Sequence, residues 1–308
     1  SHLADLHFAP TTRARENLLK EGLDRQRIFV TGNTVVDALR MILKKADEPG
    51  WSEKLKGKIK EIKRGDLTTG KSAATGQRKK AGKHGAAGIT SWLDAILERG
   101  RTAGAKSVPA ARPLASSASQ AAAVSTSTPS PSCPTKLILV TAHRRESFGE
   151  GMERICEAIR RVVSHVPEAE VIFPVHLNPN VRSVVFRHLS GLERVHLVEP
   201  LDYLTFVYLM QQADLILTDS GGIQEEAPSL GVPVIVMRDK TERPEAVEAG
   251  VAWLGATDPE KIERLALTLL KKVESGEFRR GLKRRNPFGD GHAAARIVTL
   301  LKNKDSGT

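Results

Sequence analysis

The chain has 308 residues, of which 40% are hydrophobic and 4% aromatic, so it is long enough to hold two modest domains with a real core. No apolar run approaches the length of a membrane span and no signal peptide is visible, which predicts a cytoplasmic protein without a membrane partner. The two cysteines, Cys133 and Cys156, lie far apart without metal-site spacing, so we expect free thiols in a reducing compartment.

The net charge of +11 is concentrated in one segment. Residues 51–134 contain 15 Lys and Arg against 5 Asp and Glu, a net charge of +10. The same segment is rich in Gly, Ala, Ser, Lys and Pro, and such a composition buries too little apolar surface to offset the entropy of ordering. We therefore predict a disordered basic insertion over residues 49–135, with one short amphipathic helix at Ile89–Leu97. Nonspecific polyanion binding is a minor alternative, and no specific nucleic acid partner is expected.

Before the insertion the pattern predicts two strands, each followed by a helix. The strands are Leu6–Ala9 and Ile28–Thr31. The first helix is capped by Thr11 or Thr12 and ends at Gly22, and the second helix runs from Val35 to about Lys45. A strand so near the first residue should follow earlier elements, and there is no initiator methionine, so we expect further residues upstream of Ser1.

After the insertion, buried strands alternate with amphipathic helices. The predicted strands are Leu137–Thr141, Val171–Val175, Val195–Val198, Asp214–Thr218, Val232–Met237 and Val251–Leu254. The predicted helices are Gly151–Val163, Val181–Leu189, Leu204–Gln212, one that starts at Ile223, Ile262–Val273 and Ala293–Leu301. Uniformly apolar strands separated by helices predict an α/β fold with a doubly wound parallel sheet that is covered on both faces.

These patterns divide the chain into four parts. Residues 1–48 begin the α/β domain with its incoming helices, and residues 49–135 form the insertion. Residues 136–302 form the main domain, and residues 303–308 are a tail.

One stretch, Ala213–Met237, carries the strongest functional signal. A buried strand ends at Asp219, Ser220, Gly221 and Gly222, and a short helix is predicted to begin at Ile223. Two glycines let backbone N–H groups approach a ligand, and a helix N-terminus attracts anions, so the turn suits a phosphate. The alternative is that the glycines only make a tight connection between strand and helix.

The two glutamates that follow point to a nucleotide. Glu225 and Glu226 are predicted to lie in the first helical turn, where a carboxylate beside a phosphate suits ribose hydroxyls. Consecutive helical residues point about 100° apart, so we expect only one of the two to face the ligand.

Polar clusters follow four of the predicted strands, where parallel sheets bind ligands. They are His143, Arg144, Arg145 and Glu146; His176, Asn178 and Asn180; Ser220 to Glu226; and Arg238 to Glu245. Any single member is readily explained as a structural histidine or a solvated ion pair. Four clusters at equivalent positions favour a site.

The chemistry of these clusters is electrostatic. His143 and Arg243 could hold phosphate oxygens, and His143 could instead act as a general acid. No nucleophile turn is visible, and His143 and His176 have no clear third ligand for a metal. Phe206 is either part of the core or a platform for a base.

Seven ordered motifs carry a resemblance to a known family. HFAPT, TGNTVVDAL, TAHRRESFG, PVHLNPNV, LTDSGGIQEEAPSLG, VMRDKTERPEAV and NPFGDGHAA resemble the non-hydrolysing UDP-N-acetylglucosamine 2-epimerases. The match covers Ser1 to about Leu43 and Lys136 to about Leu301. The resemblance implies a Rossmann-like domain, the second of a GT-B type fold. It also implies interconversion of UDP-N-acetylglucosamine and UDP-N-acetylmannosamine, by UDP elimination to a 2-acetamidoglucal and re-addition, with no cofactor and no metal.

The resemblance also assigns roles to residues of this chain. It implies that Ser220, Gly221, Gly222, His143 and Arg243 contact the diphosphate, with His143 as the candidate catalytic residue. Glu226 would bind the ribose and Phe206 would lie against the uracil. A neighbouring site for a second, activating UDP-sugar would contain Arg144, Glu146, His176 and Asn178. The expected partners are UDP and UDP-N-acetylhexosamine, and the family forms homodimers.

Two departures from the family pattern bear on activity. The chain contains essentially the second of two domains, and the acidic residues that move the C2 proton belong to the first. The insertion also replaces a short link. We therefore expect a UDP-binding half that is weak or inactive alone; the alternatives are a non-catalytic UDP-sugar-binding module and, less favoured, half of a GT-B glycosyltransferase.

Overall fold

The structure is a computed structural model that describes residues 3–46, 50 and 136–305. Apart from Gly50, the predicted insertion 49–135 and its helix at Ile89–Leu97 lie outside the described residues, as does Cys133. None of the helices in the described ranges combines the length and the apolar character needed to cross a membrane.

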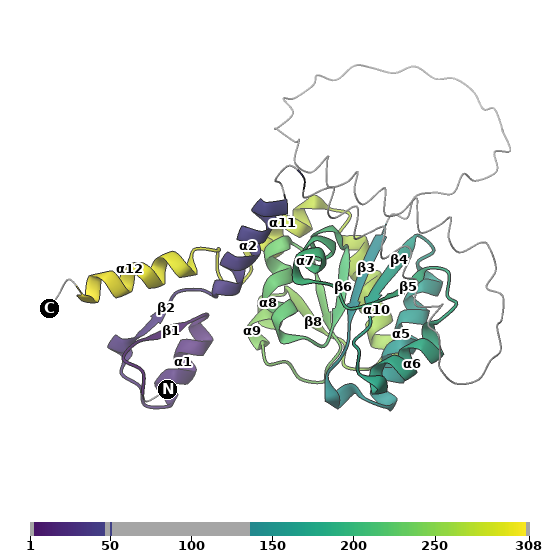
Figure 1. The fold of residues 1–308 in the computed structure, drawn as a ribbon, viewed down its shortest axis with the longest axis horizontal. Coiled ribbons are helices and arrows are strands. Elements are labelled where there is room, and N and C mark those ends of the chain that lie inside the picture. Colours follow the sequence, from purple (N-terminus) through teal and green to yellow (C-terminus); the bar gives the residue numbers. More distant parts are fainter. Residues whose placement is uncertain (1–2, 47–49, 51–135, 306–308) are drawn as a thin grey trace, which may run out of the picture.

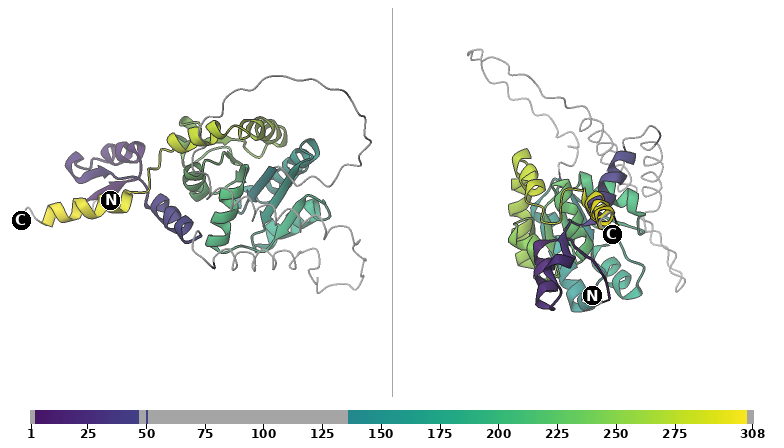
Figure 2. Two further views of the ribbon diagram at one scale, coloured as in Figure 1. Left: turned by 90° about the horizontal axis from the view of Figure 1, so that it is seen from above. Right: turned by 90° about the vertical axis from the view of Figure 1, so that its left-hand side faces the viewer.

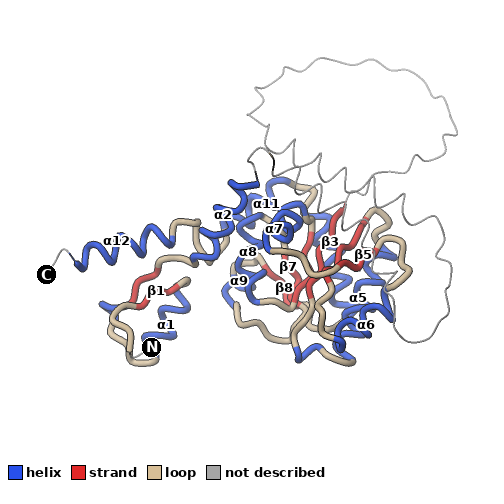
Figure 3. The backbone as a smooth tube through the Cα atoms, in the orientation of Figure 1, coloured by secondary structure: helices blue, strands red, loops and turns tan. Residues whose placement is uncertain are grey.

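A six-stranded parallel sheet forms the centre of the larger body (Figures 1 and 3). Its strands are β3 (Lys136–Thr141), β4 (Ala169–Pro174), β5 (Val195–Val198), β6 (Leu215–Thr218), β7 (Val234–Val236) and β8 (Ala252–Leu254). Their order is β5-β4-β3-β6-β7-β8, with every neighbouring pair parallel. The winding direction reverses between β3 and β6, which is the arrangement of a Rossmann-like sheet. The predicted doubly wound α/β fold is confirmed.

Helices cover both faces of this sheet. One face packs on α5 (Glu150–His165), α6 (Pro179–Leu189) and α10 (Pro259–Lys272). The other face packs on α2 (Thr34–Ala46), α7 (Tyr203–Gln212), α8 (Gly221–Leu230), α9 (Pro244–Glu248) and α11 (Gly276–Arg284). The apolar side chains of each face are buried in a separate core, so the strands are apolar on both sides, as their sequences require.

The first strands form a separate small sheet. β1 (His7–Ala9) pairs in parallel with β2 (Ile28–Val30), and α1 (Thr12–Lys20) and the 3-10 helix η1 (Arg25–Arg27) connect them. The small sheet has its own core of Ala9, Leu23 and Ile28. It lies to one side of the larger body together with α12 (Ala293–Asp305), near both chain ends (Figure 2). Of the elements predicted within residues 1–48, only α2 therefore packs against the six-stranded sheet. The domain bounds remain a prediction.

Two chain segments run side by side where the small sheet meets the larger body. Gly32, after β2, and Gly289, before α12, both have positive φ angles, and a Cβ on Gly289 would lie 3.1 Å from the Cα of Gly32. The Asn33 backbone N–H donates to the Phe288 carbonyl at 2.8 Å. The Asp37 carboxylate accepts the first two N–H groups of α12, from Ala293 and Ala294. Side-chain-free residues are thus needed where the two connections touch.

The elements predicted within residues 3–46 and 136–305 are all present, with shifted ends. The predicted apolar face of α5, with Met152, Ile155, Ile159 and Val162, is buried. α8 begins at Gly221 and not at Ile223, so the two glycines belong to its first turn. α9 and α11 were not predicted, because α9 is one turn long and α11 buries only Leu282.

Candidate functional site

The polar clusters meet at the carboxyl edge of the sheet, around the point where the winding reverses. Thr141 of β3 stands opposite Thr218 of β6, and their hydroxyl oxygens lie 2.6 Å apart. The chain then leaves β3 through His143 and leaves β6 through Asp219 and Ser220. Because the two strands end in register, the residues that follow them are brought into contact.

Asp219 joins these two connections. Its Oδ2 accepts the backbone N–H groups of His143 and Arg144, each at 2.7 Å, and its side chain is fully buried. Its Oδ1 lies 3.5 Å from His143 Nδ1. Sequence reasoning placed Asp219 in the turn but gave it no role. The signal for it, a carboxylate at the end of a buried strand, is common to many turns.

His143 and His176 come together although they follow different strands. Their rings stack with centroids 5.6 Å apart and planes 20° apart. His176 Nδ1 accepts the Asn178 backbone N–H at 3.1 Å, and the Asn178 side chain caps α6 by accepting from Asn180. Pro179 at the first helical position fixes this start. These hydrogen bonds fix the loop after β4, and with it the position of His176 beside His143.

Arg144 and Glu146 contact the loop that follows β7. Arg144 lies 3.7 Å from the Glu242 carboxylate, and Glu146 pairs with Arg238. Arg238 also reaches Glu242 at 3.4 Å, and its side chain is only 10% exposed. Two of the four predicted clusters are thus linked by these ion pairs at the sheet edge. Arg238 is a linking residue to which the sequence assigned no individual role.

Two glycines form the start of α8. Neither Gly221 nor Gly222 has a positive φ angle, so the backbone does not require glycine for a tight turn. A Cβ at Gly221 would come no nearer than 3.6 Å to its neighbours, and one at Gly222 no nearer than 4.0 Å, so packing does not require glycine either. Ser220 caps the helix without a side-chain hydrogen bond. Gly222 is exposed, whereas Gly221 is buried beside Arg144 and Glu242. The glycine backbone at Gly222 suits close approach of an anion to the N–H groups of this turn.

The two glutamates lie in the second turn of α8, which corrects the predicted first-turn position, and both are 8% exposed. The carboxylate of Glu225 accepts from Asn33 Nδ2 at 2.8 Å and pairs with Arg243 Nε. Glu226 instead forms a hydrogen bond with Tyr203. The pair thus points in two directions, as the helical angle predicts; which one meets a ligand stays a prediction.

Burial changes the titration of the Glu226–Tyr203 pair. Desolvation raises the pKa of Glu226 to about 7, against the lowering effect of the Tyr203 hydrogen bond, and the charge of Glu225 raises it further. Burial and the neighbouring Glu226 carboxylate raise the pKa of Tyr203. Glu226 can therefore take up a proton near neutral pH.

Arg243 is held in place on several sides. Its backbone N–H donates to Thr241 Oγ1 at 2.9 Å, and that hydroxyl donates to Gln224 Oε1 at 2.6 Å. Its guanidinium contacts Glu225 and the Glu242 carbonyl. Because Gln224 also donates to the Ser220 carbonyl, the loop after β7 is tied to the start of α8.

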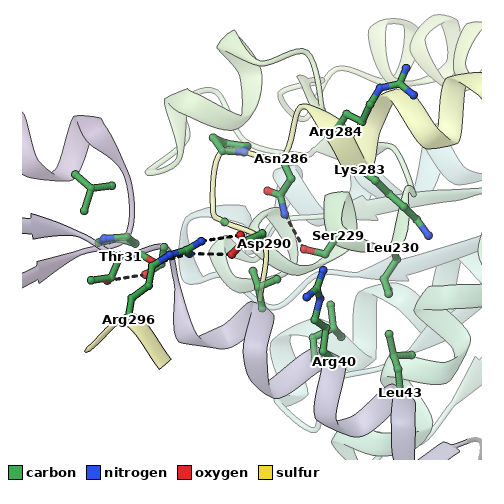
Figure 4. Close-up of a pocket in the computed structure, with 17 residues that line it drawn as sticks. Thr31, Arg40, Leu43, Ser229, Leu230, Lys283, Arg284, Asn286, Asp290 and Arg296 are labelled. Carbon is green, nitrogen blue, oxygen red and sulfur yellow. Dashed lines mark hydrogen bonds and ion pairs between the residues drawn. The ribbon is translucent and has the colours of Figure 1, made fainter. Parts of the chain in front are cut away.

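Two hollows are found in the described part of the chain, and one of them is lined by predicted site residues. The first, about 550 Å³, is lined by Asn33, Glu225 and Arg243 and by residues of α1 and α9. The second, about 590 Å³, lies where α2, the end of α8 and the segment before α12 meet (Figure 4). No predicted site residue lines it. Its Arg296 is already paired with Asp290, which lowers the pKa of Asp290 to about 2.

Phe206 is half-buried on α7 against the core that α2 and α8 share, so a packing role is established and a base-stacking role stays a prediction. Within the described ranges, no three His, Cys, Asp or Glu side chains gather as a metal site would require. The arrangement offers cations, histidines and a helix N-terminus, a combination that suits an anion.

Comparisons with known proteins agree with this chemistry. The family profile described as UDP-N-acetylglucosamine 2-epimerase matches residues 1–80 and 101–302. The UDP-N-acetylglucosamine 2-epimerase of Yersinia pestis is 41% identical over 302 residues, covering 98% of this chain and 62% of the relative.

Two solved structures are also similar. The Neisseria meningitidis UDP-GlcNAc 2-epimerase bound to UDP-GlcNAc has a TM-score of 0.64 and 35% identity, covering 97% of this chain and 62% of that one. The Methanocaldococcus jannaschii UDP-GlcNAc 2-epimerase in complex with UDP-GlcNAc and UDP has a TM-score of 0.63 and 27% identity, covering 98% and 62%. This chain spans about three fifths of the length of the curated relatives that it matches. It is a member of the UDP-N-acetylglucosamine 2-epimerase family.

Proposed function

We propose that the carboxyl edge of the six-stranded sheet binds the diphosphate of UDP and of a UDP-N-acetylhexosamine. The observation that carries the proposal is the convergence of His143, the glycine start of α8 and the anchored Arg243 on one edge. A diphosphate carries several negative oxygens, and these three groups supply a histidine, backbone N–H donors and a guanidinium.

The surrounding residues complete the nucleotide site in the same proposal. Glu226 binds the ribose hydroxyls and Phe206 lies against the uracil, at the two sides of α7 and α8 that face each other. Arg144, Glu146, His176 and Asn178 bind a second UDP-sugar. The stacking of His143 on His176 supports this part, because each of the two residues is assigned to one of the two proposed binding regions.

The reaction of the complete enzyme is the interconversion of UDP-N-acetylglucosamine and UDP-N-acetylmannosamine. A proton leaves C2 and the C1–O bond breaks, which releases UDP and leaves a 2-acetamidoglucal. UDP then adds back to C1 as a proton returns to the opposite face of C2. A site that holds the leaving diphosphate through both steps needs the fixed donors described above. This chain supplies that half of the chemistry, as part of a homodimer.

The leading alternative is a non-catalytic UDP-sugar-binding module. Its basis is that the residues proposed above contact UDP, and none of them is proposed to move the C2 proton. Incubation with UDP-N-acetylglucosamine, followed by proton NMR of the anomeric signals, tests whether this chain alone is a catalyst. We expect binding without appreciable turnover by this chain alone; turnover at ordinary enzyme rates would show that this chain is a complete catalyst.

The diphosphate assignment is tested by a ligand series. UDP, UMP and uridine are titrated into the full chain by calorimetry. We expect uridine to bind roughly ten- to a hundredfold more weakly than UDP, because it cannot make the charge-assisted hydrogen bonds. Equal affinity for UDP and uridine would contradict a diphosphate site at this edge.

A further inference from the structure

The two oxygens of the Asp219 carboxylate have different partners. Oδ2 accepts two backbone N–H groups, from His143 and Arg144. Oδ1 is buried and makes no hydrogen bond within the described part of the chain, yet it lies 3.5 Å from His143 Nδ1. One oxygen of a fully buried carboxylate is therefore turned toward the imidazole of a proposed site residue.

A buried acceptor without a donor is unfavourable, and such groups are uncommon in folded proteins. Nδ1–H of His143 is the nearest ring donor to Oδ1, and a movement of a few tenths of an ångström would bring it within hydrogen-bond distance. The ring stacks on His176, which limits its rotation. No hydrogen bond is formed by His143 Nε2 within the described residues, so that nitrogen remains available.

We propose that Asp219 is a positioning residue that holds His143 with its proton on Nδ1 and leaves Nε2 to meet the nucleotide. The inference rests on the proposed function for the role of His143. In this arrangement Nε2 can accept a proton or, once protonated, donate to a phosphate oxygen. The Asp219 carboxylate stabilises the imidazolium that forms, and it acts through His143 without touching the ligand.

The test uses an isosteric variant, Asp219→Asn. The asparagine Oδ1 can keep both backbone hydrogen bonds, so the loop stays tied, while its Nδ2 donates toward Nδ1 and favours the other tautomer. The matched control is Asp214→Asn at the opposite end of β6. Asp214 also ties a backbone N–H, that of Leu137, at 2.8 Å, and it pairs with Arg279 away from His143.

The first readout is the tautomer of His143 in the ligand-free chain, from the imidazole ¹⁵N shifts at a pH where the ring is neutral. We expect Nδ1–H in the natural sequence and in Asp214→Asn, and Nε2–H in Asp219→Asn. Nε2–H in the natural sequence, or no change in Asp219→Asn, would overturn the inference. This readout needs no nucleotide, so it is decided even if the proposed function fails.

The second readout is a double-mutant cycle of UDP affinity with Asp219→Asn and His143→Ala. We expect Asp219→Asn to weaken UDP binding about fivefold alone, and to change it little when His143 is already alanine, because the effect passes through the imidazole. An equal loss in both backgrounds would show that Asp219 acts only on the loop. Absence of UDP binding by the natural sequence would refute the proposed function, and the tautomer would still decide the inference.

Discussion

Glu225 accepts a hydrogen bond from Asn33 at 2.8 Å and also pairs with Arg243. One buried carboxylate therefore joins the connection between β2 and α2 to the loop that follows β7. The small sheet and the proposed diphosphate site are joined by this hydrogen-bonded link. A substitution at Asn33 should therefore alter the contacts of both.

Asn33→Ala should lower the free energy of unfolding by about 1 to 3 kcal/mol, because it leaves a buried Glu225 oxygen without its donor. It also removes the acceptor of the Val35 N–H. Urea unfolding measures the change. Asn17→Ala on the exposed side of α1 is the control and should stay within about 0.5 kcal/mol. Equal effects of the two variants would show that the Asn33–Glu225 bond adds nothing.

Glu226 predicts a pH dependence of stability. Its folded pKa of about 7 lies above its ordinary value of 4.5, so the folded state binds the proton more tightly than the unfolded state. The contribution of Glu226 is fully present below pH 4.5 and is lost as the pH rises through about 7. Between pH 4 and 8 the free energy of unfolding should therefore fall less steeply with rising pH for Glu226→Gln than for the natural sequence. The surface variant Glu157→Gln is the control and should follow the natural sequence. The same pH dependence of the free energy of unfolding in Glu226→Gln and in the natural sequence would rule this out.

Two glycines with positive φ angles separate backbone strain from steric overlap. A methyl group added at Gly191 (φ +83°) would meet open space, whereas a Cβ on Gly231 (φ +76°) would lie 2.7 Å from the Arg279 carbonyl oxygen. Gly191→Ala should cost about 1 to 2 kcal/mol for the left-handed backbone alone. Gly231→Ala should cost at least about 1 kcal/mol more. Thermal unfolding compares them, and a smaller loss at Gly231 would show that the end of α8 can relax.

Cys156 should resist thiol reagents in the folded protein. It is fully buried in α5, and burial raises the pKa of its thiol to about 12. In a Cys133→Ser background, labelling with a chromogenic disulfide reagent should occur only as urea unfolds the chain. Rapid labelling in native buffer would mean that the core on the α5 side opens readily.

The strands and most helices could be predicted because buried parallel strands have continuous apolar sequences and helices such as α5 bury a regular stripe. Other features depend on tertiary context. The glycines at 221 and 222 indicate a turn by propensity, yet the helix includes them because the strand end and loop fix its start. The assignment of β1 and β2 to a separate sheet depends on pairing, which apolar pattern alone does not reveal.

The sequence allowed the candidate site to be predicted as a set of polar clusters at strand ends. The hydrogen bonds and ion pairs that join the clusters could not be predicted. The contact between Asp219 and the backbone of His143 depends on β3 and β6 ending in register, at a separation of 76 residues. The link from Asn33 to Glu225 spans 192 residues, and the linking role of Arg238 requires the loops after β3 and β7 to converge. Pairings at such distances follow from the topology, which a single sequence does not specify.

Calorimetric titration of the full chain with UDP is the most direct test of the central claim. The natural sequence is compared with Ser220→Ala/Glu226→Ala, and with Ser183→Ala/Glu157→Ala on exposed helix surfaces as the matched control. We expect the natural and control chains to bind alike, and the site variant to bind at least about tenfold more weakly through the loss of a charge-assisted bond. A folded natural chain that binds no UDP, or a site variant that binds as well as the control, would contradict a nucleotide site at this edge.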